Sequence, residues 1–386
     1  MAQTIYLDNN ATTKLDERVL DAMVPVYKEH FGNPESTTHP YGWFAEELVS
    51  IAREEISEAI RSTPEEIIFT SGATEANNLA LFGSLHSYIK SSRPAHVISC
   101  VTEHSSVLEP LERLKSQGID VTLLEVSGNG SISLEALKAA LRDDTVLVSL
   151  MLANNEIGTI HDLHAVSSLV KPRGILVHTD ATQALGKISI STKSLGVDLL
   201  SLSAHKAHGP KGVGALFIKQ SVQRSIEAQL LGGGHEHGLR AGTLNVPGIV
   251  GFGKASFYAQ ADLTKTQATL QKLSRMFLDG LTKVIPGVYV NGPLENRLPG
   301  NLNLALDEIP AVTLVAELKS RVAFSLGSAC QAKHAGPSHV IKALGLEKER
   351  MHESFRIGIS KFTTEDEIFG AVQAFTDAAQ ALRSHA

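Results

Sequence analysis

The sequence predicts an α/β fold, and two patterns in the middle of the chain support this prediction. Between about residues 65 and 220, short apolar runs rich in β-branched residues alternate with stretches whose apolar residues recur at helical spacing. Most of the apolar runs stop at polar or glycine-containing segments. This alternation is typical of βαβ units, in which helices cover both faces of a mostly parallel sheet.

Seven apolar runs in this region are predicted to be strands. They span residues 65–70, 95–100, 120–126, 145–151, 174–180, 198–205 and 213–219. Helical periodicity lies between them, for example over 74–89 and 133–143. The second of these helices begins with Ser133, which is placed to cap its first turn.

A second, smaller α+β unit is predicted after this region. Residues 252–286 carry apolar residues at helical spacing with few breakers, so we expect a helix that leaves the large domain. We place the large domain at 15–260 and build the small domain from 1–14 and 261–386, because the first residues are too few to fold alone. Its further elements are predicted strands at 289–292 and 302–306, a helix near 312–320, and a strand and helix after residue 352.

Composition and charge exclude several classes of protein. Of 386 residues, 43% are hydrophobic and 20% charged, as in an ordinary globular chain, and the net charge of -6 gives no reason to expect nucleic acid or an anionic membrane as partner. The chain shows neither a signal peptide nor a membrane span, so we expect a cytoplasmic protein. Two cysteines, Cys100 and Cys330, form no disulfide framework or zinc-binding pair, and we expect no metal.

Two charged residues stand at the ends of predicted strands. Lys206 lies in SAHKAHGPKG, where glycines and a proline enforce a turn, and a lysine held in this way can form a Schiff base with pyridoxal phosphate. Asp180 follows another strand, at the edge where open α/β sheets bind ligands, and a carboxylate there keeps a pyridine nitrogen protonated. The alternatives are a solvated lysine and an aspartate that caps a helix.

The segment SGATEANN follows the first predicted strand and opens a helix. Its free backbone amides at Ala73 and Thr74, with the Thr74 hydroxyl, are placed to bind a phosphate. Helix capping by Ser71 or Thr74 explains the same residues, and the two roles are compatible.

Two further polar residues follow strands of the same predicted sheet. His104 in SCVTEHSSV is placed to lie flat on a planar cofactor or to shuttle protons. Asn155 in LANNEIG could reach a ligand at the same edge, although a role in the turn explains it equally well.

The C-terminal unit contributes a cysteine and an arginine. Cys330 lies in the small-residue segment SLGSACQAKHAGPSH, whereas Cys100 lies in an apolar run, as structural cysteines usually do. A cysteine in a polar loop can ionise and act as a nucleophile. Arg356 interrupts the short apolar strand SFRIGIS, and its planar guanidinium suits an α-carboxylate, with a surface ion pair as the alternative.

These segments together resemble the group I cysteine desulfurases, the NifS/IscS-like branch of the fold-type I pyridoxal-phosphate enzymes. The resemblance runs from LDNNATT to FRIGISKFTT and rests on SGATEANN, TEHSSV, ANNEIG, HTDATQALGK, SAHKAHGPKG, GGGHEHGLRAGT and GSAC, in the family's order. It implies a mostly parallel seven-stranded sheet in the large domain, a small domain built from both chain ends, and a homodimer with the active site near the interface.

The resemblance also implies roles around a pyridoxal 5'-phosphate cofactor. Lys206 would be the Schiff-base lysine, Asp180 would pair with the pyridine nitrogen, and His104 would stack on the ring and manage protons. Gln183 would contact the ring hydroxyl. The phosphate would be held by Ala73, Thr74, Ser203 and His205, with Thr243 of the partner subunit.

For the substrate, the resemblance implies L-cysteine. Asn155, which would also contact the cofactor, and Arg356 would receive its carboxylate. Cys330 would take the sulfur as a persulfide, leaving L-alanine, and pass it to an acceptor such as an iron-sulfur scaffold protein. The alternatives that the residues leave open are a selenocysteine lyase on the same fold and a non-catalytic sulfur-relay scaffold.

Overall fold

The computed structural model describes residues 4–327 and 336–384, so Cys330 lies outside the described residues. Its largest sheet has seven strands in the order β2-β8-β7-β6-β5-β3-β4. β8 runs antiparallel to both its neighbours, β2 and β7, and the other four pairings are parallel, so the expectation of a mostly parallel sheet is confirmed. The strands are β2 (Ile67–Thr70), β3 (His96–Cys100), β4 (Asp120–Leu124), β5 (Thr145–Ser149), β6 (Leu176–Asp180), β7 (Leu199–Ser203) and β8 (Gly214–Ile218).

Alternate residues of these strands pack against helices on opposite faces of the sheet. Ile68 of β2 and Leu216 of β8 join the cluster formed with Leu79 of α3 (Ala73–Ser91). Their neighbours Phe69 and Phe217 join the cluster on the other face, which includes residues of α2 (Pro40–Ile60) and α8 (Val246–Ala261). Both faces are therefore apolar, and this is why the strands lack a polar-apolar alternation.

The remaining helices of this part of the chain follow the expected pattern. The predicted helix over 133–143 is α5 (Leu134–Ala140), and the Ser133 side chain accepts a hydrogen bond from the amide of Ala136, so the expected cap is confirmed. The others are α1 (Glu17–Lys28), α4 (Ser105–Lys115), α6 (Leu163–Val170) and α7 (Thr192–Leu195), with short 3-10 helices η1 (Pro64–Glu66), η2 (Lys171–Arg173), η3 (Ala204–Lys206), η4 (Gln220–Ser225) and η5 (Glu236–Gly238).

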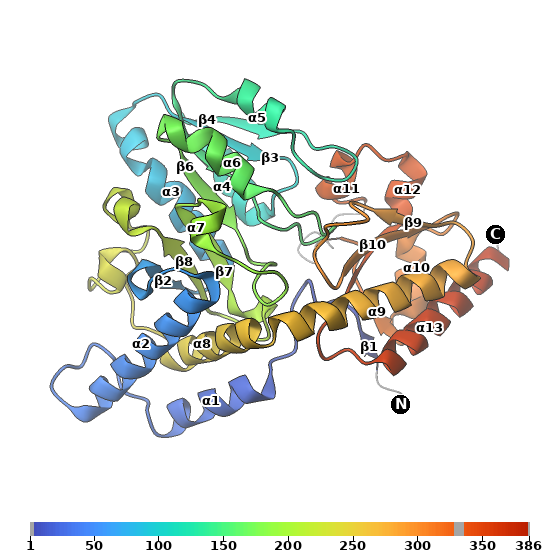
Figure 1. Ribbon diagram of the computed structural model, residues 1–386, viewed down its shortest axis with the longest axis horizontal. Coiled ribbons are helices and arrows are strands. Elements are labelled where there is room, and N and C mark those ends of the chain that lie inside the picture. The colour runs from blue at the N-terminus through green and yellow to red at the C-terminus, as the bar shows by residue number, and fades with distance from the viewer. Residues whose placement is uncertain (1–3, 328–335, 385–386) are drawn as a thin grey trace.

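The prediction of one helix over 252–286 is wrong in two respects: the helical region begins earlier, and it is interrupted. The structure has two helices, α8 and α9 (Leu263–Val284), which run end to end from the large sheet to the smaller one (Figure 1). α8 begins earlier because Asn245 caps it, accepting from the amide of Gly248, and a proline occupies its first turn. The break falls at Asp262, whose backbone leaves helical geometry and whose carboxylate accepts from Arg18 of α1 at 2.9 Å.

The smaller unit is built around a three-stranded antiparallel sheet in the order β12-β10-β9. The N-terminal segment reaches it, because Ile5 pairs with Val322 and the backbone of Asp8 bridges to Gly358. These residues therefore pack on the C-terminal part of the chain. The elements are β1 (Ile5–Tyr6), β9 (Val288–Asn291), β10 (Asn301–Leu306), β11 (Val322–Ala323), β12 (Ser354–Gly358), α10 (Ala311–Leu318), α11 (His339–Ala343), α12 (Lys348–Glu353) and α13 (Glu365–Ser384).

Among the helices of the described residues, none is both long and apolar enough to cross a membrane.

Candidate active site

A pocket of about 500 Å³ opens at the carboxyl edge of the large sheet, and it gathers most of the residues predicted from the sequence. Ten of them line it: Ala73, Thr74, His104, Asn155, Asp180, Gln183, Ser203, His205, Lys206 and Arg356. Asn10, Ala11 and Thr12 of the N-terminal segment also line it, and sequence reasoning assigned them no role.

The sheet topology explains why these residues meet. β3, β5, β6 and β7 are parallel, so their carboxyl ends lie at one edge. Asp180 ends β6 and Ser203 ends β7, while His104 and Asn155 follow β3 and β5 by a few residues. Residues from four separated segments are thereby brought into one pocket.

Lys206 is held in the pocket by the N-terminal segment. It closes the 3-10 turn that follows β7, and its amine donates hydrogen bonds to the backbone oxygens of Asn10 at 2.6 Å and Ala11 at 2.7 Å. The amine is therefore held by two backbone carbonyl groups beside the pocket, which does not fit the alternative of a freely solvated strand-end lysine.

Asp180 is only 6% exposed, and both its oxygens are fixed. One accepts from the amide of Thr182 and the other from the side chain of Asn77, each at 2.9 Å. Asn77 also donates to the Ser106 hydroxyl at 2.8 Å, and that hydroxyl lies 2.9 Å from Nδ1 of His104. A continuous set of hydrogen bonds thus links the carboxylate to the histidine.

His104 lines the pocket and also caps a helix. Its Nδ1 accepts from the amide of Ser106 in the first turn of α4. Burial lowers the pKa of His104 below its usual value, although the nearby Asp180 acts in the opposite direction. A histidine with such a pKa is neutral at pH 7, so its ring is suited to packing against a planar ligand and to accepting a proton during a reaction.

The amino end of α3 faces the same pocket. Gly72 is its N-cap residue, and among the described residues no side chain caps this helix, so capping by Ser71 or Thr74 does not occur. The amide of Ser71 instead donates to Glu75 at 2.7 Å. The first amides of α3 therefore stay available for an anion, next to Ser203 on the neighbouring strand end.

His205 lies at this end of the pocket and contacts the N-terminal segment. Its Nδ1 is 3.1 Å from the hydroxyl of Thr12. Burial, followed by the charges of Lys206 and Lys211, lowers the pKa of His205 to about 4. The ring is therefore neutral at pH 7, and as a neutral imidazole it can still donate one hydrogen bond to a phosphate oxygen.

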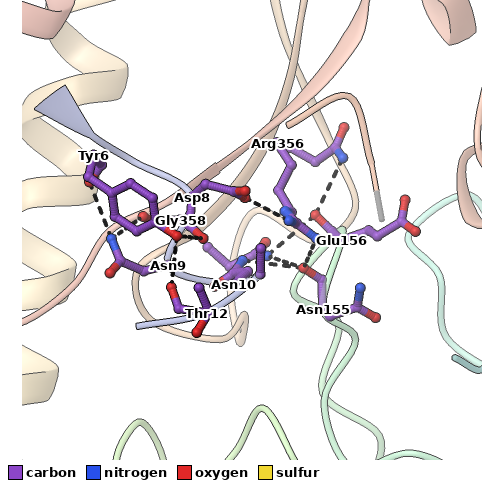
Figure 2. Close-up of polar contacts among 12 residues, drawn as sticks. Tyr6, Asp8, Asn9, Asn10, Thr12, Asn155, Glu156, Arg356 and Gly358 are labelled. Carbon is purple, nitrogen blue, oxygen red and sulfur yellow. Dashed lines mark hydrogen bonds and ion pairs between the residues drawn. The ribbon is translucent and has the colours of Figure 1, made fainter. Parts of the chain in front are cut away.

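Arg356 is 1% exposed and lies on β12, so it enters the pocket from the smaller unit. Figure 2 shows its guanidinium between two partners: Nη2 donates to the carboxylate of Asp8 at 2.8 Å, and Nη1 lies 3.5 Å from the backbone oxygen of Asn155. Its Nε is buried without a hydrogen-bond partner among the described residues. The ion pair expected as an alternative exists, but it is buried at the pocket and not on the surface.

The side chain of Asn155 has the orientation that a ligand contact needs. Its neighbour Asn154 fastens the turn, because the Asn154 Oδ1 accepts from the amides of Glu156 and Ile157 at 2.8 and 3.0 Å. The Asn155 side chain makes no hydrogen bond to the described residues and lines the pocket. The turn is therefore maintained by Asn154, which leaves the Asn155 amide for a ligand.

Two predicted residues are not in this pocket. Thr243 is exposed and does not line it, and the proposed contact across a dimer needs a second chain. Cys330 lies outside the described residues. Conversely, sequence reasoning missed Asp8 and Asn10, although both belong to LDNNATT, where three polar residues directly follow an apolar strand.

The donor set fits pyridoxal phosphate. The open helix end with Ser203 and His205 suits a phosphate, the fixed carboxylate of Asp180 suits a pyridine nitrogen, and the Lys206 amine suits an aldehyde. Two cationic side chains, those of Arg356 and Lys206, also line the pocket. This combination favours a phosphorylated cofactor and an anionic substrate.

Comparison with known proteins identifies relatives over nearly the whole chain. Residues 5–369 match the family model described as aminotransferase class-V. The chain is 46% identical to the cysteine desulfurase IscS of Neisseria meningitidis over 364 residues, covering 94% of this chain and 89% of that protein. Among solved structures, a NifS-like protein superposes with a TM-score of 0.91 at 36% identity, covering 98% of this chain and all of that chain. A structure titled "SspA in complex with cysteine" gives 0.83 at 32% identity, covering 94% and 100%.

Proposed function

Because this chain belongs to the aminotransferase class-V family, we propose that it is a cysteine desulfurase, which takes sulfur from L-cysteine and releases L-alanine. Membership of the family implies pyridoxal 5'-phosphate as the cofactor. The observation that carries the proposal is the meeting of Lys206, Asp180 and Arg356 in one pocket from three distant parts of the chain. An amine, a carboxylate and a guanidinium are what a pyridoxal enzyme acting on an amino acid requires.

The residues that would hold the cofactor are those that line the pocket. Lys206 would hold it covalently through its amine, and Asp180 would keep its ring nitrogen protonated. The phosphate would be held by the amides of Ala73 and Thr74 with Ser203 and His205, and by Thr243 of the partner subunit. When bound, the cofactor supplies an electron sink that makes the substrate α-proton acidic and the bond to sulfur breakable.

The chain's own residues would position the substrate and move its protons. Arg356 and Asn155 would bind the α-carboxylate of L-cysteine, which orients the α-carbon toward Lys206. The amine of Lys206 would act as the base that removes the α-proton. His104 is neutral and lines the same pocket, so it would accept the thiol proton of the substrate and return a proton to the product.

We assign the sulfur-accepting role to Cys330 on the sequence alone. Its thiolate would form a sulfur-sulfur bond to the substrate while the bond from the substrate Cβ to sulfur breaks. The electron pair of that bond stays with the carbon skeleton, which takes up a proton and leaves as alanine. The balance is cysteine plus enzyme thiol giving alanine plus enzyme persulfide, with no outside oxidant or reductant.

The final acceptor of the persulfide and the assembly state belong to the same proposal. An acceptor protein, such as a scaffold for iron-sulfur clusters, would take the sulfur from Cys330. A homodimer would place Thr243 of the partner subunit at the phosphate, which accounts for the exposure of Thr243 in the single chain.

The test is an absorbance scan of the purified protein near 420 nm, followed by addition of L-cysteine and parallel assays of alanine and sulfide. We expect a yellow protein that forms alanine and sulfur in equal amounts, and a Lys206→Ala variant that has lost both the colour and the turnover. A folded protein that binds no pyridoxal phosphate would contradict the proposal and would favour a non-catalytic scaffold. A Cys330→Ala variant that turns over selenocysteine as fast as the wild type does, and a wild type that does not act on cysteine, would favour a selenocysteine lyase.

A further inference from the structure

Lys187 is a buried lysine that the proposed reaction does not use. It is 6% exposed, does not line the active-site pocket, and lies four residues along the chain from Gln183, which does. Its backbone oxygen accepts from the side chain of Gln267 on α9 at 3.0 Å. Burial, followed by the charges of Lys206 and Arg356, lowers the pKa of Lys187 to about 7. A buried amine is costly, so its contacts indicate what it does.

The Lys187 amine donates to Oε1 of Gln183 at 2.9 Å. On the other side, Nε2 of Gln183 donates to the backbone oxygen of Asn10, also at 2.9 Å. A backbone oxygen can only accept and an ammonium group can only donate, so these two partners allow a single orientation of the amide. A neutral amine also donates, and this orientation therefore does not depend on the protonation of Lys187.

We propose that Lys187 is a positioning residue that fixes Gln183 as a hydrogen-bond donor toward the cofactor. With Oε1 turned to Lys187, the second N–H of Nε2 is the polar group that Gln183 offers to the pocket it lines. An atom that meets this N–H must be an acceptor, and the ring oxygen of pyridoxal phosphate in its anionic form is such an atom. This inference rests on the proposed function, since it concerns the same cofactor.

Gln183 and Lys206 share one acceptor. The Asn10 oxygen receives hydrogen bonds from both Gln183 and Lys206, so the amide and the amine that would hold the cofactor are fixed relative to one another. Without Lys187, Oε1 of Gln183 would be a buried acceptor that has lost its donor, and only the Asn10 oxygen would hold the amide in this orientation. The donor facing the pocket would then be fixed on one side only, and its bond to the cofactor would weaken.

The experiment measures the binding of pyridoxal 5'-phosphate to apo-protein and the pH midpoint at which the absorbance of the bound cofactor changes. We expect Lys187→Met to weaken binding roughly fivefold, the value of one hydrogen bond. We also expect the midpoint to rise, because a ring oxygen without its donor is more basic and the chromophore keeps its proton to a higher pH. Lys193→Met, at an exposed position, is the matched control and should change neither quantity.

A double variant separates positioning from packing. If Lys187 acts through Gln183, then Lys187→Met should add nothing to Gln183→Ala, in affinity or in midpoint. The inference would be overturned if Lys187→Met weakened cofactor binding fivefold both in the wild type and in Gln183→Ala. It would also be overturned if Lys187→Met changed neither the affinity nor the midpoint. A wild-type protein that binds no cofactor would instead overturn the proposed function, and this inference with it.

Gln183→Glu tests the same point if Lys187→Met does not fold. The carboxylate keeps a partner for Lys187, but it has no N–H to offer the cofactor. We expect the midpoint to rise as it does in Lys187→Met, and an unaltered midpoint would overturn the inference.

Discussion

The guanidinium of Arg356 donates to the carboxylate of Asp8 at 2.8 Å, with 1% of the arginine side chain and 18% of the aspartate side chain exposed. The two residues are 348 positions apart in sequence, and the bond joins the segment that follows β1 to β12, the last strand. Asp8 occupies Nη2, and the backbone oxygen of Asn155 lies 3.5 Å from Nη1, so the second N–H of Nη1 is the one left for a substrate carboxylate (Figure 2). Asp8 therefore orients the residue that would select the substrate.

Asp8→Ala should raise the KM for L-cysteine about tenfold and leave kcat within about twofold, because the lost charge-assisted bond is worth about 1.5 kcal/mol and acts on binding. Steady-state kinetics of the holoenzyme measure this. Asp8→Asn is the matched control, since its amide oxygen still accepts from Nη2, and its KM should rise less. A wild-type KM in Asp8→Ala would contradict the orienting role.

The two cysteines should differ sharply in reactivity. Burial raises the pKa of Cys100 well above its ordinary value, so this thiol stays protonated and unreactive in the folded protein. Cys330→Ala should keep the cofactor absorbance and lose desulfuration, whereas Cys100→Ala should retain activity. Native Cys330→Ala should also resist alkylation until it is unfolded. Rapid labelling of the folded variant, read by mass spectrometry, would show that Cys100 is accessible.

Glu103 should make the fold less stable as the pH rises. It is fully buried, and burial raises the pKa of its carboxyl to about 8. Between the ordinary pKa of about 4.5 and 8, the folded state holds a proton that the unfolded state has released, so stability is lost as pH rises through this window. Glu103→Gln mimics the protonated acid and should remove the dependence.

Denaturant unfolding at pH 5 and pH 9 measures the prediction for Glu103. The Gln variant can still accept from the amide of Met151, as Glu103 does at 2.6 Å, so the local structure should persist. If the free energy of unfolding changes with pH equally in the wild type and in Glu103→Gln, Glu103 is ionised in the folded protein and the prediction is wrong.

His161 should weaken the protein at acid pH. It is 4% exposed, its Nε2 is buried without a partner among the described residues, and burial lowers the pKa of His161 to about 4. Above about 6.5 the histidine is neutral in both states; as pH falls toward 4, only the unfolded state gains the proton, so stability is lost. The loss should approach 3 kcal/mol, on the order of the pKa difference.

The measurement for His161 is unfolding between pH 7 and pH 4, compared with His161→Gln, which does not titrate. Exposed His164, three residues along the chain, provides the control as His164→Gln, and this change should leave the pH dependence as it is in the wild type. If His161→Gln loses stability as steeply as the wild type when the pH falls, other groups cause the acid sensitivity and the prediction for His161 is wrong.

Much of the fold could be predicted because it depends on short-range patterns. Each strand of the large sheet lies within its expected apolar run, and Ser133 caps the helix that it precedes. The prediction failed where a contact from afar decided a boundary. Asp262 divides α8 from α9 and is held by Arg18, a partner that no local window contains. The domain boundaries at 14 and 260 stay a prediction.

The candidate site was predictable for a related reason. Parallel strands place their carboxyl ends together, so polar residues that follow such strands, such as Asp180 and Asn155, are expected at one pocket. Asp8 and Asn10 were missed because their role depends on the N-terminal strand crossing to the last part of the chain. The partners of Gln183 were missed for the same reason.

By itself, the sequence determined the elements of the large sheet, the set of chemical groups at its edge, and the resemblance that named a cofactor and a substrate. Only the tertiary structure decided which of those groups touch: Asp8 with Arg356, Asn77 with Asp180, and Lys187 with Gln183. The physical reason is that strand and helix formation follows the periodicity of neighbouring residues, whereas a hydrogen bond between distant residues forms only after the core has packed and placed their backbones within 3 Å.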